Sequence, residues 1–274
     1  MKILIVYNKE KSIGLELAYK VSDILTLSGT ETVISEFSRE INSCCKMPDD
    51  IDAVVVIGGD GTILKVAKAA AEHNYPILGI NAGRLGYLAS VDSDNLEVLK
   101  RLSDNDFSIE TRMLLKAEKI VDGKVVDVCH CLNDAVISKN TLSNVIDINL
   151  KIGNDTINYR ADGIIASTPT GSTAYSLSAG GPVVDPELQC FVLTPVCPHT
   201  LVARSVVLDA SHEVYINISS GDLSSIQLLC DGRKAYEIDD KTTVKISKSD
   251  LKAQFIKLNN ISVYKVFSEK TYNY

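Results

Sequence analysis

The chain has 274 residues, enough for one large domain or two modest ones with a well-buried core. Hydrophobic residues make up 45% and charged residues 23%, as in ordinary globular proteins, which excludes the disordered and fibrous classes. The 28 Lys and Arg residues against 35 Asp and Glu residues give a net charge of −7, which argues against a broad nucleic-acid-binding surface. A small polyanionic ligand still fits, because a few cations and backbone N–H groups can hold phosphates.

The apolar run at residues 3–7 is too short for an export signal or a membrane span, so we expect a cytoplasmic protein without membrane contact. In that compartment the seven cysteines are expected to be reduced thiols. Cys129, His130 and Cys131 resemble a metal-binding triplet. In a strand, however, alternation would point the two cysteines to one face and the histidine to the other, so no metal site is predicted there.

Residues 1–110 alternate short apolar strands with amphipathic helices, which predicts an α/β domain with a doubly wound, Rossmann-like sheet. Residues 52–57 are apolar almost without interruption, as in a strand that is buried on both faces. The other predicted strands are 2–7, 33–37 and 76–81, and the predicted helices are 14–27, 62–73 and 96–102.

Residues 111–254 predict a β-rich domain, because apolar and polar residues alternate and turn dipeptides recur at short intervals. Asp122-Gly123 and Asp231-Gly232 are the clearest turn signals. The predicted strands are 116–121, 124–128, 145–152, 156–160, 213–218, 226–230 and 235–238. A last strand is predicted at 261–267, either returning to the first domain or ending the second.

The strongest local signal is the buried strand that runs into Gly58-Gly59-Asp60-Gly61-Thr62 at the start of a helix. Glycines let the backbone approach a ligand, and the N–H groups of the first helical turn can bind an anion, so this loop predicts a phosphate cradle. Asp60 has three possible roles: it can accept a proton from an attacking hydroxyl, help to hold Mg²⁺, or cap the helix.

Two more loops carry polar groups suited to a nucleotide. Asn81–Leu88 follows the next strand at the same edge of the sheet, where Arg84 can supply phosphate charge and Tyr87 a stacking face. Asn133 and Asp134 pair an amide with a carboxylate, which can read a purine edge and a ribose diol. A surface arginine, a packed tyrosine and a plain turn are the structural alternatives.

The segment Tyr159–Pro182 runs from a strand into a Pro/Gly turn crowded with hydroxyl groups and then into a short helix. Hydroxyls both donate and accept hydrogen bonds, which suits a purine and its sugars, and Tyr175 can stack on a base. The alternative is a helix with a Ser- and Thr-rich cap.

With these segments in order, and with Leu193–Thr200 after them, the chain resembles the NAD kinases of bacteria over most of its length. The resemblance implies a Rossmann-like N-terminal domain, a β-sandwich C-terminal domain and a tail at about 255–274 that returns to the first. It implies phosphorylation of the 2′-hydroxyl on the adenosine ribose of NAD, with ATP, another nucleoside triphosphate or polyphosphate as donor. It also implies a divalent cation such as Mg²⁺, without an assigned protein ligand, and a homo-oligomer, either dimer or tetramer.

The same resemblance implies the roles of particular residues. Asp60 becomes the proton acceptor, with Gly61 beside it at the dinucleotide. The other residues that it places at the ligands are Lys65, Asn133, Asp134, Arg160, Asp162, Thr173, Ala174, Tyr175, Ser176, Leu177 and Ser178.

Two other functions remain open at this point. A lipid or sphingoid kinase shares the Gly-Gly-Asp-Gly-Thr loop, although it would want an apolar groove or a basic membrane face. A dinucleotide sensor would bind NAD without transferring phosphate. Because Asp134 stands where the family often has Glu, the preference between NAD and NADH is also open.

Overall fold

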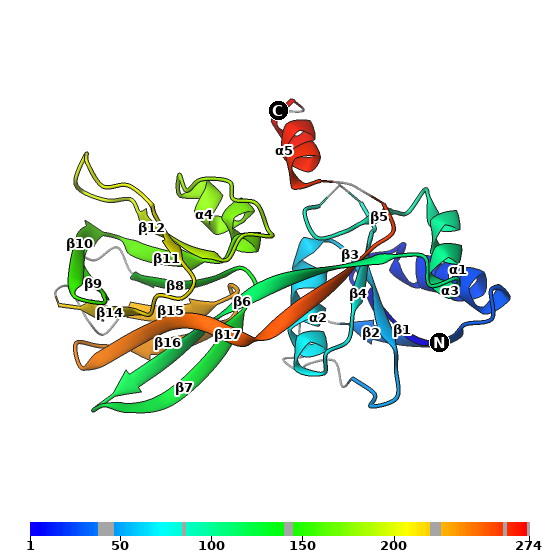
Figure 1. Ribbon diagram of the computed structural model, residues 1–274, viewed down its shortest axis with the longest axis horizontal. Helices are drawn as coiled ribbons and strands as arrows, with labels where there is room; N and C mark the ends of the chain where they lie inside the picture. Colours follow the sequence, from blue (N-terminus) through cyan, green and yellow to red (C-terminus); the bar gives the residue numbers. More distant parts are fainter. Residues whose placement is uncertain (38–46, 84–85, 140–144, 220–225, 260–261, 273–274) are drawn as a thin grey trace. The chain divides into compact units, whose positions relative to one another are not determined.

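The structure is a computed structural model that describes residues 1–37, 47–83, 86–139, 145–219, 226–259 and 262–272 (Figure 1). The chain divides into two compact units, one of Met1–Arg112 with Lys252–Tyr274 and the other of Met113–Leu251. Strands β6 (Ser108–Val121) and β17 (Thr242–Lys257) each contribute residues to both units.

The first unit is built on a parallel sheet. Its central strands run in the order β2 (Glu31–Phe37), β1 (Lys2–Asn8), β3 (Ala53–Gly58) and β4 (Ile77–Asn81). The short strand β5 (Val91–Asp92) and Phe255 of β17 also pair with β4 in parallel. Every residue of β3 is buried, as its uninterrupted apolar sequence predicts for a central parallel strand.

Helices cover both faces of this sheet (Figure 1). On one face, α1 (Gly14–Leu27), the 3₁₀ turn η1 (Leu96–Leu99) and α3 (Lys100–Ser103) share one core with the strands. Helix α2 (Asp60–Glu72) packs on the other face, where Ile63 lies so close to Gly79 that an added Cβ would be 2.7 Å from its Cδ1 atom. The predicted α/β architecture is confirmed.

The second unit contains two β-sheets. Strands β10 (Asp155–Ala161), β9 (Ile146–Ile152), β14 (Val214–Ile218) and β17 form one, and β6 with β7 (Lys124–Cys131) continues it beyond β17. The other sheet runs in the order β13 (Val206–Asp209), β12 (Cys190–Val196), β11 (Gly163–Ser167), β8 (Asp134–Lys139), β15 (Ile226–Cys230) and β16 (Lys234–Ile238).

One hydrophobic core joins the two sheets of this unit. Leu150 and Ile216 from the first sheet belong to the same buried cluster as Ile137 and Phe191 from the second. Side chains alternate between this core and the outside along β9 and β14, which is the pattern that predicted them. The β-sandwich prediction is therefore confirmed.

Two hairpin turns were readable from the sequence. Asp122 and Gly123 have φ of 50° and 73°, and Asp231 and Gly232 have φ of 48° and 66°. Consecutive positive φ values are what a tight turn between twisted antiparallel strands needs, and Asp-Gly accommodates them.

The strand predicted at 261–267 is wrong for residues 263–267, and Ile261 lies outside the described residues. Residues Val263–Tyr272 form helix α5, in which Val263, Val266 and Phe267 follow helical spacing, with Val266 buried. Helix α2 begins at Asp60, two residues before the predicted start. Strand β17 was not predicted, because Ile246 and Ser247 are both buried and the alternation changes face between them.

The expectation of reduced cysteines is wrong for Cys129 and Cys230, which form a disulfide. Cys131, Cys190 and Cys197 are outside that bond, and Cys44 and Cys45 lie outside the described residues. The predicted alternation in β7 holds, because Cys129 and Cys131 face the core while the His130 ring lies 2.7 Å from Ser249 Oγ.

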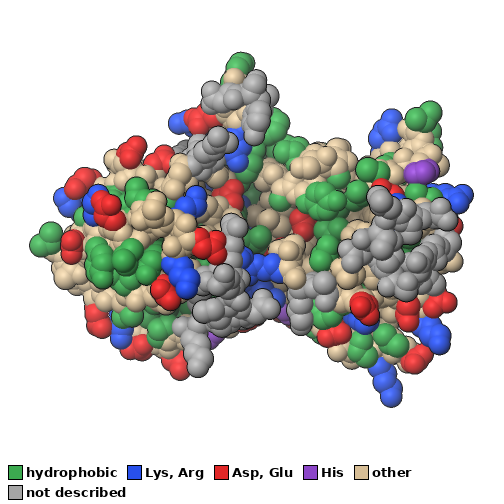
Figure 2. Space-filling view, turned by 180° about the vertical axis from the view of Figure 1, so that it is seen from behind, with side chains coloured by type: hydrophobic (Ala, Val, Ile, Leu, Met, Phe, Trp, Pro, Cys, Tyr) green, Lys and Arg blue, Asp and Glu red, His purple; other side chains and the backbone are tan. Residues whose placement is uncertain are grey.

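Acidic and basic side chains are interspersed over the face drawn in Figure 2, in keeping with the modest net charge. Among the described residues, no helix has the length and hydropathy needed to cross a membrane.

Substituting Gly163 with alanine tests the packing of the sandwich. An added Cβ would overlap the carbonyl oxygen of Ile137 and press on the Ser138 backbone, neither of which can move aside. We expect Gly163→Ala to lower the free energy of unfolding by roughly 1–3 kcal/mol, measured by urea denaturation. Gly83→Ala is the control and should unfold like the wild type, because among the described residues its Cβ would meet only Lys11 Nζ, at 3.7 Å.

Candidate active site

The glycine loop of the first unit is a close-packed turn between β3 and α2. A Cβ on Gly58 would lie 2.7 Å from Thr62 Cβ, so this position requires glycine. Thr62 is fixed in turn by the buried Asn8, whose Nδ2 donates to Thr62 Oγ1 at 3.1 Å. The amides of Asp60 and Gly61 belong to the first helical turn, where N–H groups have no acceptor within the helix. The predicted phosphate cradle thus lies at a helix N-terminus, where free N–H groups can bind an anion.

The carboxylate of Asp60 is held by the loop that follows β4. The Tyr87 N–H donates to Asp60 Oδ2 at 2.9 Å, and the Leu88 N–H donates to Oδ1 at 3.1 Å. Gly86 lies directly against the carboxylate, since a Cβ there would overlap Asp60 Oδ1. The helix-cap alternative is wrong, because the capping residue is Gly59 and the Asp60 side chain bonds to the other loop.

The other candidate residues of the first unit are Lys65, Tyr87 and Arg84. Lys65 on α2 places its Nζ 5.1 Å from the ring centroid of Phe37. The Tyr87 ring lies 4.0 Å from Nζ of Lys270 on α5, so it packs against a cation. Burial raises the pKa of Tyr87, and the nearby charge of Asp60 adds to this effect. Arg84 lies outside the described residues.

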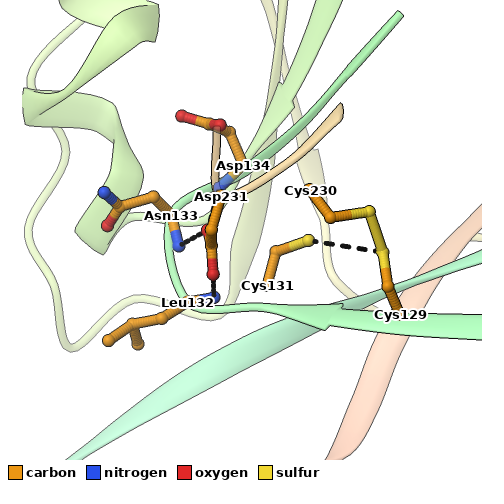
Figure 3. The surroundings of a disulfide bond; sticks show 7 residues. All are labelled: Cys129, Cys131, Leu132, Asn133, Asp134, Cys230 and Asp231. Carbon is orange, nitrogen blue, oxygen red and sulfur yellow. Dashed lines mark hydrogen bonds between the residues drawn. A yellow bond between two sulfur atoms is a disulfide. The ribbon is translucent and has the colours of Figure 1, made fainter. Parts of the chain in front are cut away.

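In the second unit, Asn133 and Asp134 are held through their backbone. The carboxylate of Asp231 accepts N–H groups from Leu132 at 3.0 Å, from Asn133 at 2.9 Å and from Asp134 at 3.1 Å. The side chains of Asn133 and Asp134 point away from the nearby disulfide (Figure 3). One acid thus fixes three consecutive residues of the predicted dinucleotide loop.

Asp134 is an unusual carboxylic acid because it is only 5% exposed. Burial raises its pKa to about 7, with a further contribution from the charge of Asp231. Asp134 pairs with Ser167 across β8 and β11, so the two side chains lie on the same face. In the described part of the chain the buried hydroxyl of Ser167 has no hydrogen-bond partner. A buried acid and a buried hydroxyl thus lie on one face of this sheet.

The Pro/Gly turn packs onto the Asn133 loop. The Thr168 N–H donates to the Asn133 carbonyl at 2.9 Å, and Thr168 Oγ1 donates to the Leu132 carbonyl at 2.5 Å. Gly171 packs against the Asn133 carbonyl, because a Cβ on Gly171 would overlap the Asn133 oxygen. The sequence-predicted loops of this unit are therefore neighbours in space.

Several hydroxyl groups of this turn serve the protein itself. The turn continues as η2 (Thr170–Thr173) and α4 (Tyr175–Ser178). The hydroxyl of Thr173 donates to the Thr170 carbonyl at 3.2 Å, and Ser176 Oγ lies 2.9 Å from Thr194 Oγ1 in the core. Tyr175 and Ser178 are exposed, whereas Ala174 and Leu177 are partly buried. Tyr175 is thus accessible for stacking.

The two remaining candidates form ion pairs within this unit. Asp162 Oδ1 lies 2.7 Å from Lys139 Nζ, a partly buried pair between β8 and the residue before β11. Arg160 Nε lies 3.6 Å from Asp147 Oδ1 on the neighbouring strand, and both side chains are largely exposed. The structure therefore shows protein partners for both.

Reasoning from sequence missed Asp231, Gly86 and Lys139. Asp231 was interpreted only as a turn residue, although an Asp at a turn commonly bonds to nearby amides. Its actual partners lie 97 to 99 residues earlier in the chain, and no local pattern predicts that pairing.

The raised pKa of Asp134 predicts a pH-dependent stability. The folded protein keeps a proton on this group up to about pH 7, whereas an unfolded Asp loses it near 3.8, so the free energy of unfolding should fall as pH rises from about 4 to 7. Asp134→Asn removes this pH dependence, because an amide does not titrate. The difference in the free energy of unfolding between the variant and the wild type should therefore increase by about a few kcal/mol as pH rises over that range, in favour of the variant. Urea denaturation at pH 4.5, 6 and 8 measures it.

Asp155→Asn removes one exposed acid from the β10 hairpin and serves as the matched charge control. Equal curves for Asp134→Asn and wild type at all three pH values would contradict the raised pKa.

The family models that match this chain are those of NAD kinases, and two similar relatives are NAD kinases. Residues 3–107 match the model of the ATP-NAD kinase N-terminal domain, and residues 132–258 match that of the C-terminal domain. An NAD kinase of Symbiobacterium thermophilum is 34% identical over 98% of each chain, and one of Carboxydothermus hydrogenoformans is 40% identical over 84% of this chain and 83% of its own.

Among solved structures, an NAD kinase from Archaeoglobus fulgidus in complex with ATP superposes with a TM-score of 0.79 at 25% identity, covering 100% of both chains. Both domain models match in the expected order, and together they span most of the sequence. The chain belongs to the NAD kinase family.

Proposed function

We propose that this protein phosphorylates NAD on the 2′-hydroxyl of its adenosine ribose and so makes NADP. The donor is ATP, another nucleoside triphosphate or polyphosphate. The observation that carries this proposal is the carboxylate of Asp60, which two N–H groups fix beside a glycine-rich helix N-terminus. Family membership supplies the substrates, since the relatives named above are NAD kinases and one was solved with ATP.

In the proposed reaction, the 2′-oxygen forms a bond to the terminal phosphorus while the bond from phosphorus to the donor's bridging oxygen breaks. Asp60 accepts the hydroxyl proton. Phosphoryl transfer depends mainly on positioning and charge stabilisation, because the transition state is loose. A carboxylate with a fixed orientation meets that demand, and good alignment of the reactants can lower the barrier by roughly 7–11 kcal/mol.

The dinucleotide is bound mainly by groups of the second unit in this proposal. Asn133 supplies its amide, and Asp134 supplies a buried polar pair together with Ser167, whose hydroxyl has no hydrogen-bond partner among the described residues. Tyr175 offers an exposed ring for stacking. Asp162 and the segment Thr173–Ser178 complete the contacts, while Gly61, Lys65 and Arg160 follow from family resemblance alone.

A magnesium ion fits this proposal. Each oxygen of Asp60 already accepts one N–H group, which leaves a second lone pair on each. Mg²⁺ commonly uses one or two carboxylates together with phosphate oxygens and water. When bound, the ion would neutralise phosphate charge, and Asp60 is the described carboxylate best placed to approach it.

We also propose a homo-oligomer, either dimer or tetramer, in the cytoplasm. Leu201 and Val202 support self-association, because these apolar side chains are 96% and 85% exposed on the second unit. Size-exclusion chromatography with light scattering measures the number of subunits directly.

The test of the activity is a product assay with NAD, Mg²⁺ and, in parallel, ATP, other nucleoside triphosphates or polyphosphate. We expect NADP with at least one donor. A folded protein that binds NAD but makes no NADP with any donor would be a sensor. Phosphorylation of diacylglycerol or sphingosine, and not of NAD, would identify a lipid kinase.

Asp60→Asn tests the proton acceptor. The amide keeps the size of the side chain but cannot take up the proton, so we expect turnover to fall about 100- to 10,000-fold. The dissociation constant for NAD should change little, as measured by calorimetry. Wild-type turnover in this variant would remove Asp60 from the proposed role.

Gly86→Ala tests whether the fixed orientation of Asp60 matters. The new Cβ would displace the carboxylate, and a misplacement of about 1 Å can cost roughly 100-fold in rate. We expect turnover to fall by about that factor with NAD affinity largely kept. Gly83→Ala in the same loop is the matched control and should keep its turnover. Equal turnover in the two variants would contradict the orientation argument.

A further inference from the structure

Three cysteines of the second unit converge in its core. Cys129 on β7 is bonded to Cys230 at the end of β15, and Cys131 Sγ lies 3.8 Å from Cys129 Sγ. The three sulfur atoms lie within 4.8 Å of one another, and the residues are 2%, 5% and 0% exposed in the order Cys129, Cys230, Cys131. Because β7 and β15 belong to different sheets, the disulfide links the two layers of the sandwich.

Two cysteines of this cluster are adjacent in sequence to residues that form or hold the loop with Asn133 and Asp134. Cys230 directly precedes Asp231, whose carboxylate binds the three consecutive N–H groups of that loop. Cys131 directly precedes Leu132, the first of those donors (Figure 3). The sulfur cluster therefore adjoins both the acceptor and the donors of the hydrogen bonds that shape the loop.

Opening the disulfide has to move these neighbours. Reduction breaks the S–S bond and adds a hydrogen atom to each sulfur, so two thiols need more room than one disulfide. A close-packed interior has no spare volume for that change, so the strands must shift. The shift acts on Asp231 through Cys230 and on Leu132 through Cys131.

We propose that Cys129 and Cys230 form a reversible thiol–disulfide site that sets the NAD affinity of the Asn133–Asp134 loop. The regulatory half of this proposal rests on the proposed function. In the oxidising direction, the Cys230 thiolate attacks a small disulfide, such as oxidised glutathione, and releases one small thiol. The Cys129 thiolate then attacks Cys230 Sγ and releases the second. Two protein thiols lose two electrons and two protons, and one small disulfide becomes two thiols.

The first experiment tests the bond itself and needs no activity. The full-length protein is reduced, exposed to oxidised glutathione, alkylated and digested, and its crosslinked peptides are identified by mass spectrometry. We expect the Cys129–Cys230 crosslink in the wild type and in Cys190→Ser, a control at another buried cysteine. Cys129→Ser should lack it. A wild-type protein without this crosslink would overturn the proposal.

The reduced protein is also assayed for bound zinc. One zinc ion per chain that is lost in Cys131→Ser would assign the three thiols to a metal site and would equally overturn the proposal. We expect no stoichiometric zinc.

The second experiment measures NAD binding by calorimetry in the oxidised and the reduced protein. We expect the reduced wild type to bind about 5- to 20-fold more weakly, within the usual range for coupled sites. Cys129→Ser should match the reduced wild type under both conditions, and Cys190→Ser should respond to redox state as the wild type does.

A plain structural link would change the melting temperature and leave NAD affinity unaltered, so equal affinities in the two redox states would overturn the regulatory claim. If NAD binds in neither state while the crosslink is mapped, the proposed function and the regulatory claim fail and the disulfide stands.

Discussion

The carboxylate of Asp60, the proposed proton acceptor, is held in place by the backbone of another loop. The N–H groups of Tyr87 and Leu88 donate to its two oxygens, and Gly86 leaves the space in which the carboxylate lies. A carboxylate beside a phosphate cradle repels phosphates, so its presence there calls for a function. In the proposed reaction, that function is to accept the hydroxyl proton from a fixed position beside the glycine loop.

In the second unit, too, a carboxylate accepts backbone N–H groups from a distant segment of the chain. Asp231 holds three consecutive amides, and the Pro/Gly turn rests on the same loop through Thr168 and Gly171. In both units an acid from one segment binds the backbone of another. Gly86 leaves room for the Asp60 carboxylate, and Gly171 lets the Pro/Gly turn approach the Asn133 carbonyl. Asp134 shows what this tight packing costs, because burial next to Asp231 raises its pKa to about 7. The energetic cost of burying that acid is consistent with a functional position.

The sequence predicted what depends on neighbours in the chain. The apolar run of β3, the spacing of α1 and the Asp-Gly turns each indicate their structure locally. The glycine loop indicated an anion site for the same reason. Contacts between distant segments were not readable: Asp60 meets residues 27 and 28 positions away, and the disulfide spans 101. A strand was predicted at 261–267, where the structure has a helix from Val263 onward, because a short apolar stretch suits a strand as well as a helix.

We propose that Asp60 faces the ribose hydroxyl that is phosphorylated. A crystal structure of the protein with NAD and an unreactive ATP analogue measures this directly. The account predicts a carboxylate oxygen of Asp60 within about 2.6–3.2 Å of the 2′-oxygen on the adenosine ribose. A well-ordered NAD whose adenosine ribose lies far from Asp60, or presents a different hydroxyl to it, would contradict the account.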